Sequence, residues 1–358
     1  MKQNQPLLLI DLLKVFAALL IILHHLSNYG QIAVDARTVL PGLMTWLFEY
    51  GRYAVQIFLV TAGFLATQSL TRYANAKLSS QTLLRVIINR YLRLFAPYLA
   101  ALLVTILCAW IARFWVNDEF VGESETLSQF IAHLFFLQNI LGFDSISAGV
   151  WYVAIDWQLY SVLAILLISF SSYQALIWLL SIVAVSALLY FNRSTQYEAY
   201  FIYFIGSYWL GVLAYLAKNF ADQKIRRLAK AALLAIGLII AISAFQEIWP
   251  RNFLAWFVAL LLLVWGNVGY PTYESAHTEW RTKMLRAIAW ASPRSYCAFL
   301  IHFAFILLAN TLYIASGLHS HESGALAICL ILGVLMFSVI AANYLYRWVE
   351  LPSGKLKI

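Results

Sequence analysis

Apolar residues occur in long runs along the chain, and shorter polar segments separate these runs. A helix needs roughly 20 mostly apolar residues to cross a bilayer. Because backbone polar groups must be satisfied inside lipid, runs of this kind are predicted to be helical. Ten runs approach the required length, over residues 7–28, 52–71, 95–116, 151–170, 173–190, 198–217, 229–248, 252–270, 295–316 and 324–346.

The polar segments between the runs differ in charge. Basic residues gather in segments 72–94, 218–230 and 271–294 and after the last run, whereas segment 117–150 is acidic. If the chain has ten spans and both termini are cytoplasmic, every basic segment falls in the cytoplasm and the acidic segment falls outside, as the positive-inside rule requires. We therefore predict an all-α polytopic membrane protein with a single integral domain over residues 1–358.

The composition agrees with a membrane protein, since 63% of the residues are hydrophobic and 11% are charged, against about 25% charged in soluble domains. The net charge of +8 is explained by basic cytoplasmic loops, so no nucleic-acid partner is expected. Cys108, Cys297 and Cys329 lie in apolar stretches without metal-ligand spacing, so neither a disulfide nor a metal is expected. The last run ends close to the end of the sequence, and we expect any chemistry to take place in the membrane.

The first run carries ionisable residues at bilayer depth, where such groups are costly and tend to mark function. Lys14 and His25 are 11 residues apart, which puts them on one helix face, roughly 16 Å apart along the axis. Asp11 precedes Lys14 by three residues and is expected to pair with it. His24 points about 100° away from His25 and is interpreted as a packing or interfacial residue.

Two of these residues keep alternative interpretations. Lys14 either lines a passage through the protein or extends toward the cytoplasmic surface, as long cationic side chains do near helix ends. His25 is either a satisfied histidine or a general base, since histidine is the usual base near neutral pH.

Six stretches together resemble the acyltransferase-3 family of integral membrane O-acyltransferases. They occur in the family's order over nearly the whole chain, in a form without a fused soluble domain, and the family's ten spans agree with the ten runs. The sequence departs from the family pattern at Gln56, Ala62 and Asp156, where the family has Asp, Ser and Glu. The stretches are Lys14-x10-His25, "VQIFLVTAGFL" (55–65), "RYLRLFAPY" (90–98), "WYVAIDWQLY" (151–160), "SYCAFLIH" (295–302) and "YRWVELP" (346–352).

The resemblance implies an activity and its partners. Family members move an acyl group, typically acetyl, from cytoplasmic acyl-CoA to a hydroxyl of an envelope glycan or its lipid-linked precursor. It also implies location in a bacterial cytoplasmic (inner) membrane, with lipids as neighbours. Acetyl-CoA is then a co-substrate, and no permanently bound cofactor is expected.

The residues are interpreted against that task. His25 is the candidate general base, and Asp156 is the candidate carboxylate that orients it. Arg90 and Arg93, placed at the cytoplasmic start of the third span, and Lys14 are candidates for holding the donor, because guanidinium groups bind phosphate with paired hydrogen bonds. The alternative for the two arginines is binding of anionic lipid headgroups.

Four further residues have weaker assignments. His302 either lines the donor tunnel or is a packing residue. Trp151 and Tyr160 are candidates for stacking on an acceptor sugar, and interfacial anchoring is their alternative. Glu350, like Asp11, is expected to be structural.

Two other functions are consistent with the same polar residues. A secondary transporter or flippase also uses intramembrane Lys, His and Asp, although carriers usually have repeated halves and no repeat is visible in this chain. A non-catalytic relative that binds a lipid-linked glycan is a third hypothesis.

Overall fold

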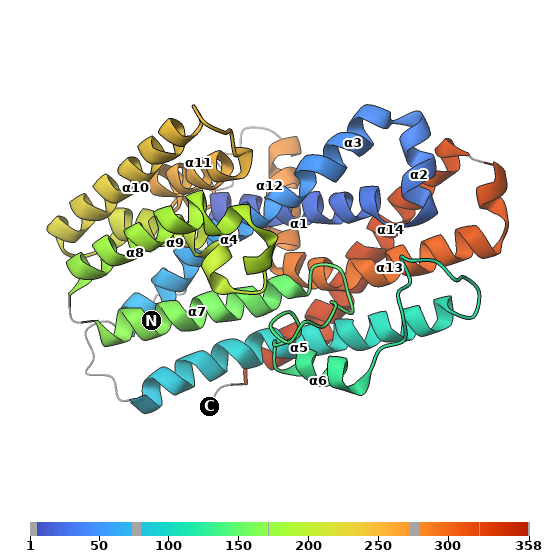
Figure 1. Cartoon of the computed structure of the whole chain (residues 1–358), viewed down its shortest axis with the longest axis horizontal. Helices are drawn as coiled ribbons and strands as arrows, with labels where there is room; N and C mark the ends of the chain where they lie inside the picture. Colours follow the sequence, from blue (N-terminus) through green and yellow to red (C-terminus); the bar gives the residue numbers. More distant parts are fainter. Residues whose placement is uncertain (1–5, 74–79, 171, 272–278, 322, 357–358) are drawn as a thin grey trace.

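The computed structural model describes residues 6–73, 80–170, 172–271, 279–321 and 323–356. These residues form helices joined by short segments, and no strand is found among them (Figure 1). The helices are α1 Leu8–Asn28, α2 Gly30–Val39, α3 Pro41–Tyr50, α4 Ala54–Leu70, α5 Ser80–Ala112, α6 Leu127–Leu134, α7 Trp151–Ser169, α8 Tyr173–Leu189, α9 Phe201–Asn219, α10 Gln223–Ser243, α11 Pro250–Trp265, α12 Glu279–Ala291, α13 Ser295–Ala315, α14 Gly324–Leu345 and the short α15 Leu351–Ser353.

The long helices have the length and composition of membrane spans. In the described part of the chain, eight helical segments could cross a membrane by these criteria, and α11 is apolar but shorter. Each of the ten predicted runs has a helical counterpart, with α10 and α11 completing the set. The prediction of an all-α polytopic membrane protein is therefore confirmed. Figure 1 shows α1, α5 and α13 running in one direction and α7 running in the opposite one. The cytoplasmic side of the termini stays a prediction.

Two predicted boundaries are wrong in ways that affect the site. The third span was predicted over 95–116, but α5 begins at Ser80 and is 33 residues long. Arg90 and Arg93 therefore lie within a helix and not in a cytoplasmic loop. The seventh span was predicted over 229–248, but α10 begins at Gln223 because the Asp222 side chain caps it by accepting from the backbone N–H of Lys224.

The segment after α1 contains two short helices that the hydrophobic runs did not predict. α2 and α3 have ten residues each, too few to cross a bilayer. They lie at the C-terminal end of α1 (Figure 1), where α2 contacts α13 and α14 and α3 contacts α1.

Helix α9 forms the centre of the packing and contacts α4, α8, α10 and α11. A Cβ atom on Gly63 would collide with the carbonyl oxygen of Tyr208, and one on Gly211 would collide with that of Val60. The backbones of α4 and α9 therefore touch, as small residues permit at helix interfaces in membranes. This close approach fixes the position of Tyr208, which lies at the edge of the site.

Candidate active site

Two histidines from different helices meet near the C-terminal end of α1. Nδ1 of His25 lies 2.7 Å from Nε2 of His302, which α13 contributes. The rings are nearly parallel, with centroids 5.0 Å apart and an angle of 5° between their planes. His25 is 8% exposed and His302 is 0% exposed. One nitrogen must carry the proton and the other must accept it, so the bond constrains the tautomers of both rings.

His24 has different surroundings from its neighbour His25. Its Nδ1 donates a hydrogen bond to the carbonyl oxygen of Leu47 in α3. A Cβ atom on Gly51 would lie 2.8 Å from the Cβ of His24, so this side chain packs where α3 returns toward α1. The geometry matches the interpretation of His24 as a packing residue on another face of α1.

The site is closed on one side by Gly149, two residues before α7. This glycine has φ +88°, in the left-handed region that favours glycine. A Cβ atom there would lie 2.9 Å from the ring of Phe299 and 3.5 Å from Cε1 of His25. The absence of a side chain thus lets the backbone lie against both rings.

The segment that leads to Gly149 is held by His133 of α6. The N–H of Ile146 donates to Nε2 of His133 at 3.1 Å, and Nδ1 of His133 lies 2.8 Å from the carbonyl oxygen of Gln129. Since the Ile146 N–H can only donate, Nε2 accepts and Nδ1 carries the proton. Burial is the main cause that lowers the pKa of His133, and its bond to Gln129 opposes this shift.

Asp156 pairs with Arg90 and not with His25. Nη2 of Arg90 lies 2.5 Å from Oδ2 of Asp156, and the two side chains are 24% and 5% exposed. The guanidinium carbon of Arg90 also lies 5.0 Å from the ring centroid of Tyr160. The predicted contact between Asp156 and His25 is therefore wrong, because the carboxylate neutralises a cation carried by α5.

A second charged group lies beside the ion pair. Arg93 is exposed and interacts electrostatically with Arg90, Glu350 and Asp156. Lys14 interacts electrostatically with Asp11, Arg93 and Glu350. Lys14 of α1, Arg93 of α5 and Glu350 from beyond α14 thus lie near one another, although the chain separates them widely. Lys14 and Arg93, both predicted from the sequence as candidates for holding the donor, thus lie near each other, with Glu350 beside them.

Asp11 and Glu350 make contacts that tie helices together. Oδ2 of Asp11 accepts from the hydroxyl of Tyr270 at 2.9 Å, and Oδ1 accepts from Ser292 at 2.5 Å. Tyr270 and Ser292 thus hold the Asp11 carboxylate, which also interacts electrostatically with Lys14, as their spacing predicted. Oε2 of Glu350 accepts from the thiol of Cys297 at 3.0 Å.

The two aromatic candidates for acceptor binding lie in different places. Trp151, at the start of α7, stacks on Phe204 with centroids 5.4 Å apart and is half-buried. Tyr160 is 8% exposed and its ring is covered by the guanidinium of Arg90. The prediction that Tyr160 presents its face to a sugar is therefore wrong in this structure, whereas the acceptor role of Trp151 stays a prediction.

The site thus combines a buried imidazole pair at one end of α1 with a cluster of charged residues around Lys14 of the same helix. The family model described as an acyltransferase domain matches residues 7–347. The chain belongs to the acyltransferase-3 family. It is a membrane acyltransferase in general terms, and the resemblance carried by the six stretches is confirmed. No significant match was found among curated proteins or among solved structures.

Gln56 occupies the position where the acyltransferase-3 pattern has an acid. Its Oε1 accepts from the hydroxyl of Ser207 at 2.5 Å, and the residue is 8% exposed. A neutral amide therefore pairs with a neutral hydroxyl at this position of the acyltransferase, and α4 is joined to α9 without a buried charge.

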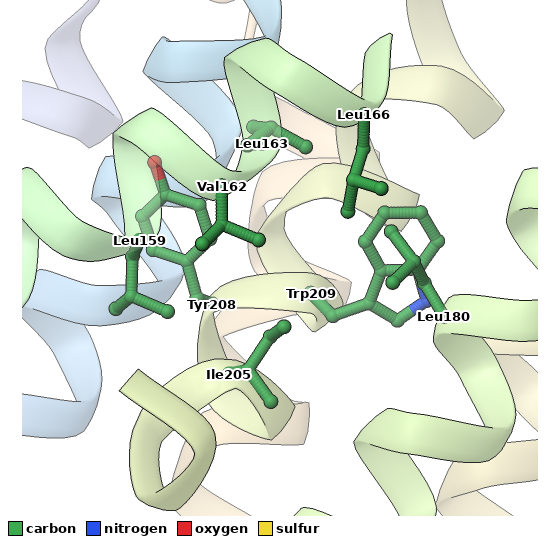
Figure 2. Close-up of a pocket in the computed structure, with 8 residues that line it drawn as sticks. All are labelled: Leu159, Val162, Leu163, Leu166, Leu180, Ile205, Tyr208 and Trp209. Atoms are coloured by element: carbon green, nitrogen blue, oxygen red, sulfur yellow. The ribbon is translucent and has the colours of Figure 1, made fainter. Parts of the chain in front are cut away.

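Tyr208 is a residue of the acyltransferase site that the sequence did not single out. It interacts electrostatically with Asp156 and Arg90, and its ring also lines an apolar hollow between α7, α8 and α9. Figure 2 shows its hydroxyl pointing away from Leu180 and Trp209, which line the same hollow. Its hydroxyl and Nε of Arg90 are buried and have no hydrogen-bond partner among the described residues. Only packing reveals this arrangement, since a tyrosine in an apolar helix has no distinctive sequence pattern.

Proposed function

We propose that this acyltransferase moves an acyl group, in the first instance acetyl, from cytoplasmic acyl-CoA to a hydroxyl of an envelope glycan or its lipid-linked precursor in a bacterial cytoplasmic membrane. The observation that carries the proposal is the placement of His25. Its imidazole is nearly buried and hydrogen-bonded through Nδ1, while Lys14 lies on the same helix about 16 Å away. We propose that this base and this cation flank the passage by which the donor reaches the acceptor.

The reaction needs a base because an alcohol is a poor nucleophile at neutral pH. The hydroxyl oxygen attacks the thioester carbonyl as its proton passes to Nε2 of His25. The carbon–sulfur bond then breaks, and the CoA thiolate takes that proton from His25. The ester product and free CoA balance the reaction, and the imidazole returns to its neutral form.

The donor requires cations for its phosphates and polar partners for its pantetheine arm. Arg93 is exposed, so we propose that Arg93 and Lys14 meet the phosphates. Arg90 is held by Asp156, and its role is then to line the passage. Nε of Arg90 and the hydroxyl of Tyr208, which have no hydrogen-bond partner in the part of the chain that the structure describes, are suited to the two amides of pantetheine, because a buried polar atom gains most when it finds a partner.

The acceptor is proposed to approach from the side of Trp151 and Gly149. Trp151 precedes Tyr152, whose ring packs against Phe299 with centroids 5.8 Å apart. Phe299 in turn lies against Gly149 and its ring is 6.3 Å from His302. Flat aromatic surfaces next to a base suit a sugar, which presents an apolar face and a ring of hydroxyls.

The test uses the purified chain in nanodiscs with acetyl-CoA carrying a labelled acetyl group. An acyltransferase releases CoA thiol, slowly to water and faster when extracted envelope glycolipid is added, and the label moves to the glycolipid. A transporter or flippase leaves the thioester intact under both conditions. Intact thioester with correctly folded protein would therefore overturn the proposal.

A further inference from the structure

The imidazole pair raises the question of what orients His25. In histidine-dependent acyl transfer the nitrogen that does not meet the substrate usually donates to a carboxylate, which fixes the tautomer and stabilises the imidazolium. The carboxylate predicted for that task, Asp156, is held by Arg90. The only hydrogen-bond partner of the His25 ring within the described residues is another imidazole.

We propose that His302 is the positioning residue for His25, so that an imidazole takes the place of the carboxylate in this acyltransferase. The inference rests on the proposed function, because it assigns a role relative to the base. It differs from the interpretations of His302 as a packing residue or as part of the donor tunnel.

The tautomers follow from the hydrogen-bonding capacity of each ring. A base must offer an unprotonated Nε2 to the substrate, so His25 carries its proton on Nδ1 and donates it to Nε2 of His302. His302 then carries its own proton on Nδ1. The ring interacts with the backbone carbonyl groups of Ala298 and Phe299, about one turn back along α13, and its Nδ1 makes no hydrogen bond of standard geometry among the described residues. Both carbonyls are acceptors, which agrees with a protonated Nδ1.

The arrangement also accounts for the charge that develops during reaction. When Nε2 of His25 takes the proton of the hydroxyl, the positive charge is shared across the hydrogen bond, and the proton between the rings can shift to Nε2 of His302. It shifts back when His25 releases a proton to the thiolate. No other reactant is needed, and no ion pair has to be buried beside the site.

Packing holds His302 in place. It is 0% exposed, and Phe299, one turn before it, is pressed by the backbone of Gly149. The titratable groups that face His25 are His302, His24 and Tyr29, whose ring centroids lie 5.0, 5.4 and 5.8 Å from that of His25. His24 is engaged with Leu47, and the structure assigns the partner role to His302.

The test compares three substitutions that separate hydrogen bonding from volume. In His302→Gln the amide can place an acceptor where Nε2 was, in His302→Asn the amide is too short to reach, and in His302→Phe the ring volume stays without an acceptor. The rate of CoA thiol release from acetyl-CoA, with water as acceptor, is measured for each variant in nanodiscs. His24→Ala is the matched control.

We expect kcat to fall about 100-fold in His302→Asn and His302→Phe, with the KM for acetyl-CoA unchanged, because a misplaced base loses about that much. His302→Gln should recover at least ten-fold of the loss. Equal rates in all variants, or equal loss in the Gln variant, would overturn the positioning role. A rise in KM at constant kcat would also overturn it, since that result belongs to a donor-tunnel residue.

A second measurement keeps the test decisive if a single variant fails to fold. Thiol release to water should keep a residual rate in the His25→Ala background, and His302→Gln should not lower that rate further, because two residues that act as a unit are non-additive. Independent losses would contradict the inference. Absence of thiol release from the unmodified protein would instead overturn the proposed function, so the two failures are distinguishable.

Discussion

Arg90 of α5 and Asp156 of α7 form an ion pair at 2.5 Å, with Asp156 only 5% exposed. This pair joins two helices in the middle of the protein and neutralises a cation that would otherwise be costly there. Removing one partner of a buried pair leaves the other charge uncompensated, at a cost of about 3–5 kcal/mol.

The first prediction concerns this pair. Asp156→Leu should lower the thermal unfolding midpoint strongly, because Arg90 keeps its charge without a partner. Combining it with Arg90→Met should recover most of the loss, since an apolar pair of similar volume is often as stable as an ion pair. Unfolding in detergent measures both variants. Equal midpoints for the single and double variants would show that the pair does not contribute as described.

The second prediction separates the donor-binding cation from cations that only face the membrane surface. Arg93→Ala should raise the KM for acetyl-CoA about ten- to 150-fold, because a charge-assisted hydrogen bond to phosphate contributes about 1.5–3 kcal/mol. Arg85→Ala is the matched control, since Arg85 is also exposed and lies on the same helix. Steady-state rates at varied acetyl-CoA give both constants. The same KM in both variants would remove Arg93 from the donor site.

The third prediction uses two glycines of one loop. Gly142 and Gly149 both have positive φ, at +75° and +88°, but a Cβ added at Gly149 would meet atoms within 4 Å, whereas one added at Gly142 would meet none. An Ala substitution at either should cost about 1–2 kcal/mol through backbone strain. Gly149→Ala should in addition lower the rate of thiol release, because its methyl group displaces Phe299 and His25.

Gly142→Ala is the control for Gly149→Ala. Both variants should fold, with a lower thermal midpoint for Gly149→Ala because of its contact with Phe299, whereas only Gly149→Ala loses activity. Full activity of Gly149→Ala would mean that the backbone at this point does not set the position of the imidazole.

The helical period and charge rules predicted part of the site from the sequence. The spacing of Lys14 and His25 identifies a single face of α1, because the period of an isolated helix is known. The partner of His25 could not be predicted, since His302 lies 277 residues away in the chain and contacts between spans depend on packing. Sequence periodicity does not specify which helices become neighbours.

The predicted helix boundary next to Arg90 was wrong for a different physical reason. Counting charges assigns an arginine to a segment outside the membrane, and this assumption set the predicted start of the third span at residue 95. The chain instead buries Arg90 because Asp156 supplies the opposite charge. A pair distributed over two spans has no local signal, so each residue looked like a separate candidate.

The fourth prediction concerns pH. The pKa of buried His133 is below its ordinary value of about 6.5, so the unfolded state binds a proton at higher pH than the folded state does. His133 therefore contributes stability above pH 6.5, and this contribution is lost as pH falls through the folded pKa. The thermal unfolding midpoint should therefore decrease as the pH is lowered from 7 to 5.

His133→Gln should flatten this dependence, because the amide keeps an acceptor for the N–H of Ile146 without titrating. Midpoints measured at matched ionic strength compare the two proteins. An identical slope with pH in both would assign the dependence to other groups.

The central claim is that the imidazole of His25 is the base for acyl transfer. The most direct measurement compares His25→Ala with His24→Ala for transfer of labelled acetyl from acetyl-CoA to envelope glycolipid, with folding checked by thermal unfolding. We predict that His25→Ala abolishes transfer while folding is retained, and that His24→Ala loses only the stability of its bond to Leu47, about 1 kcal/mol. Equal loss of transfer in both variants, or full transfer in His25→Ala, would contradict the account.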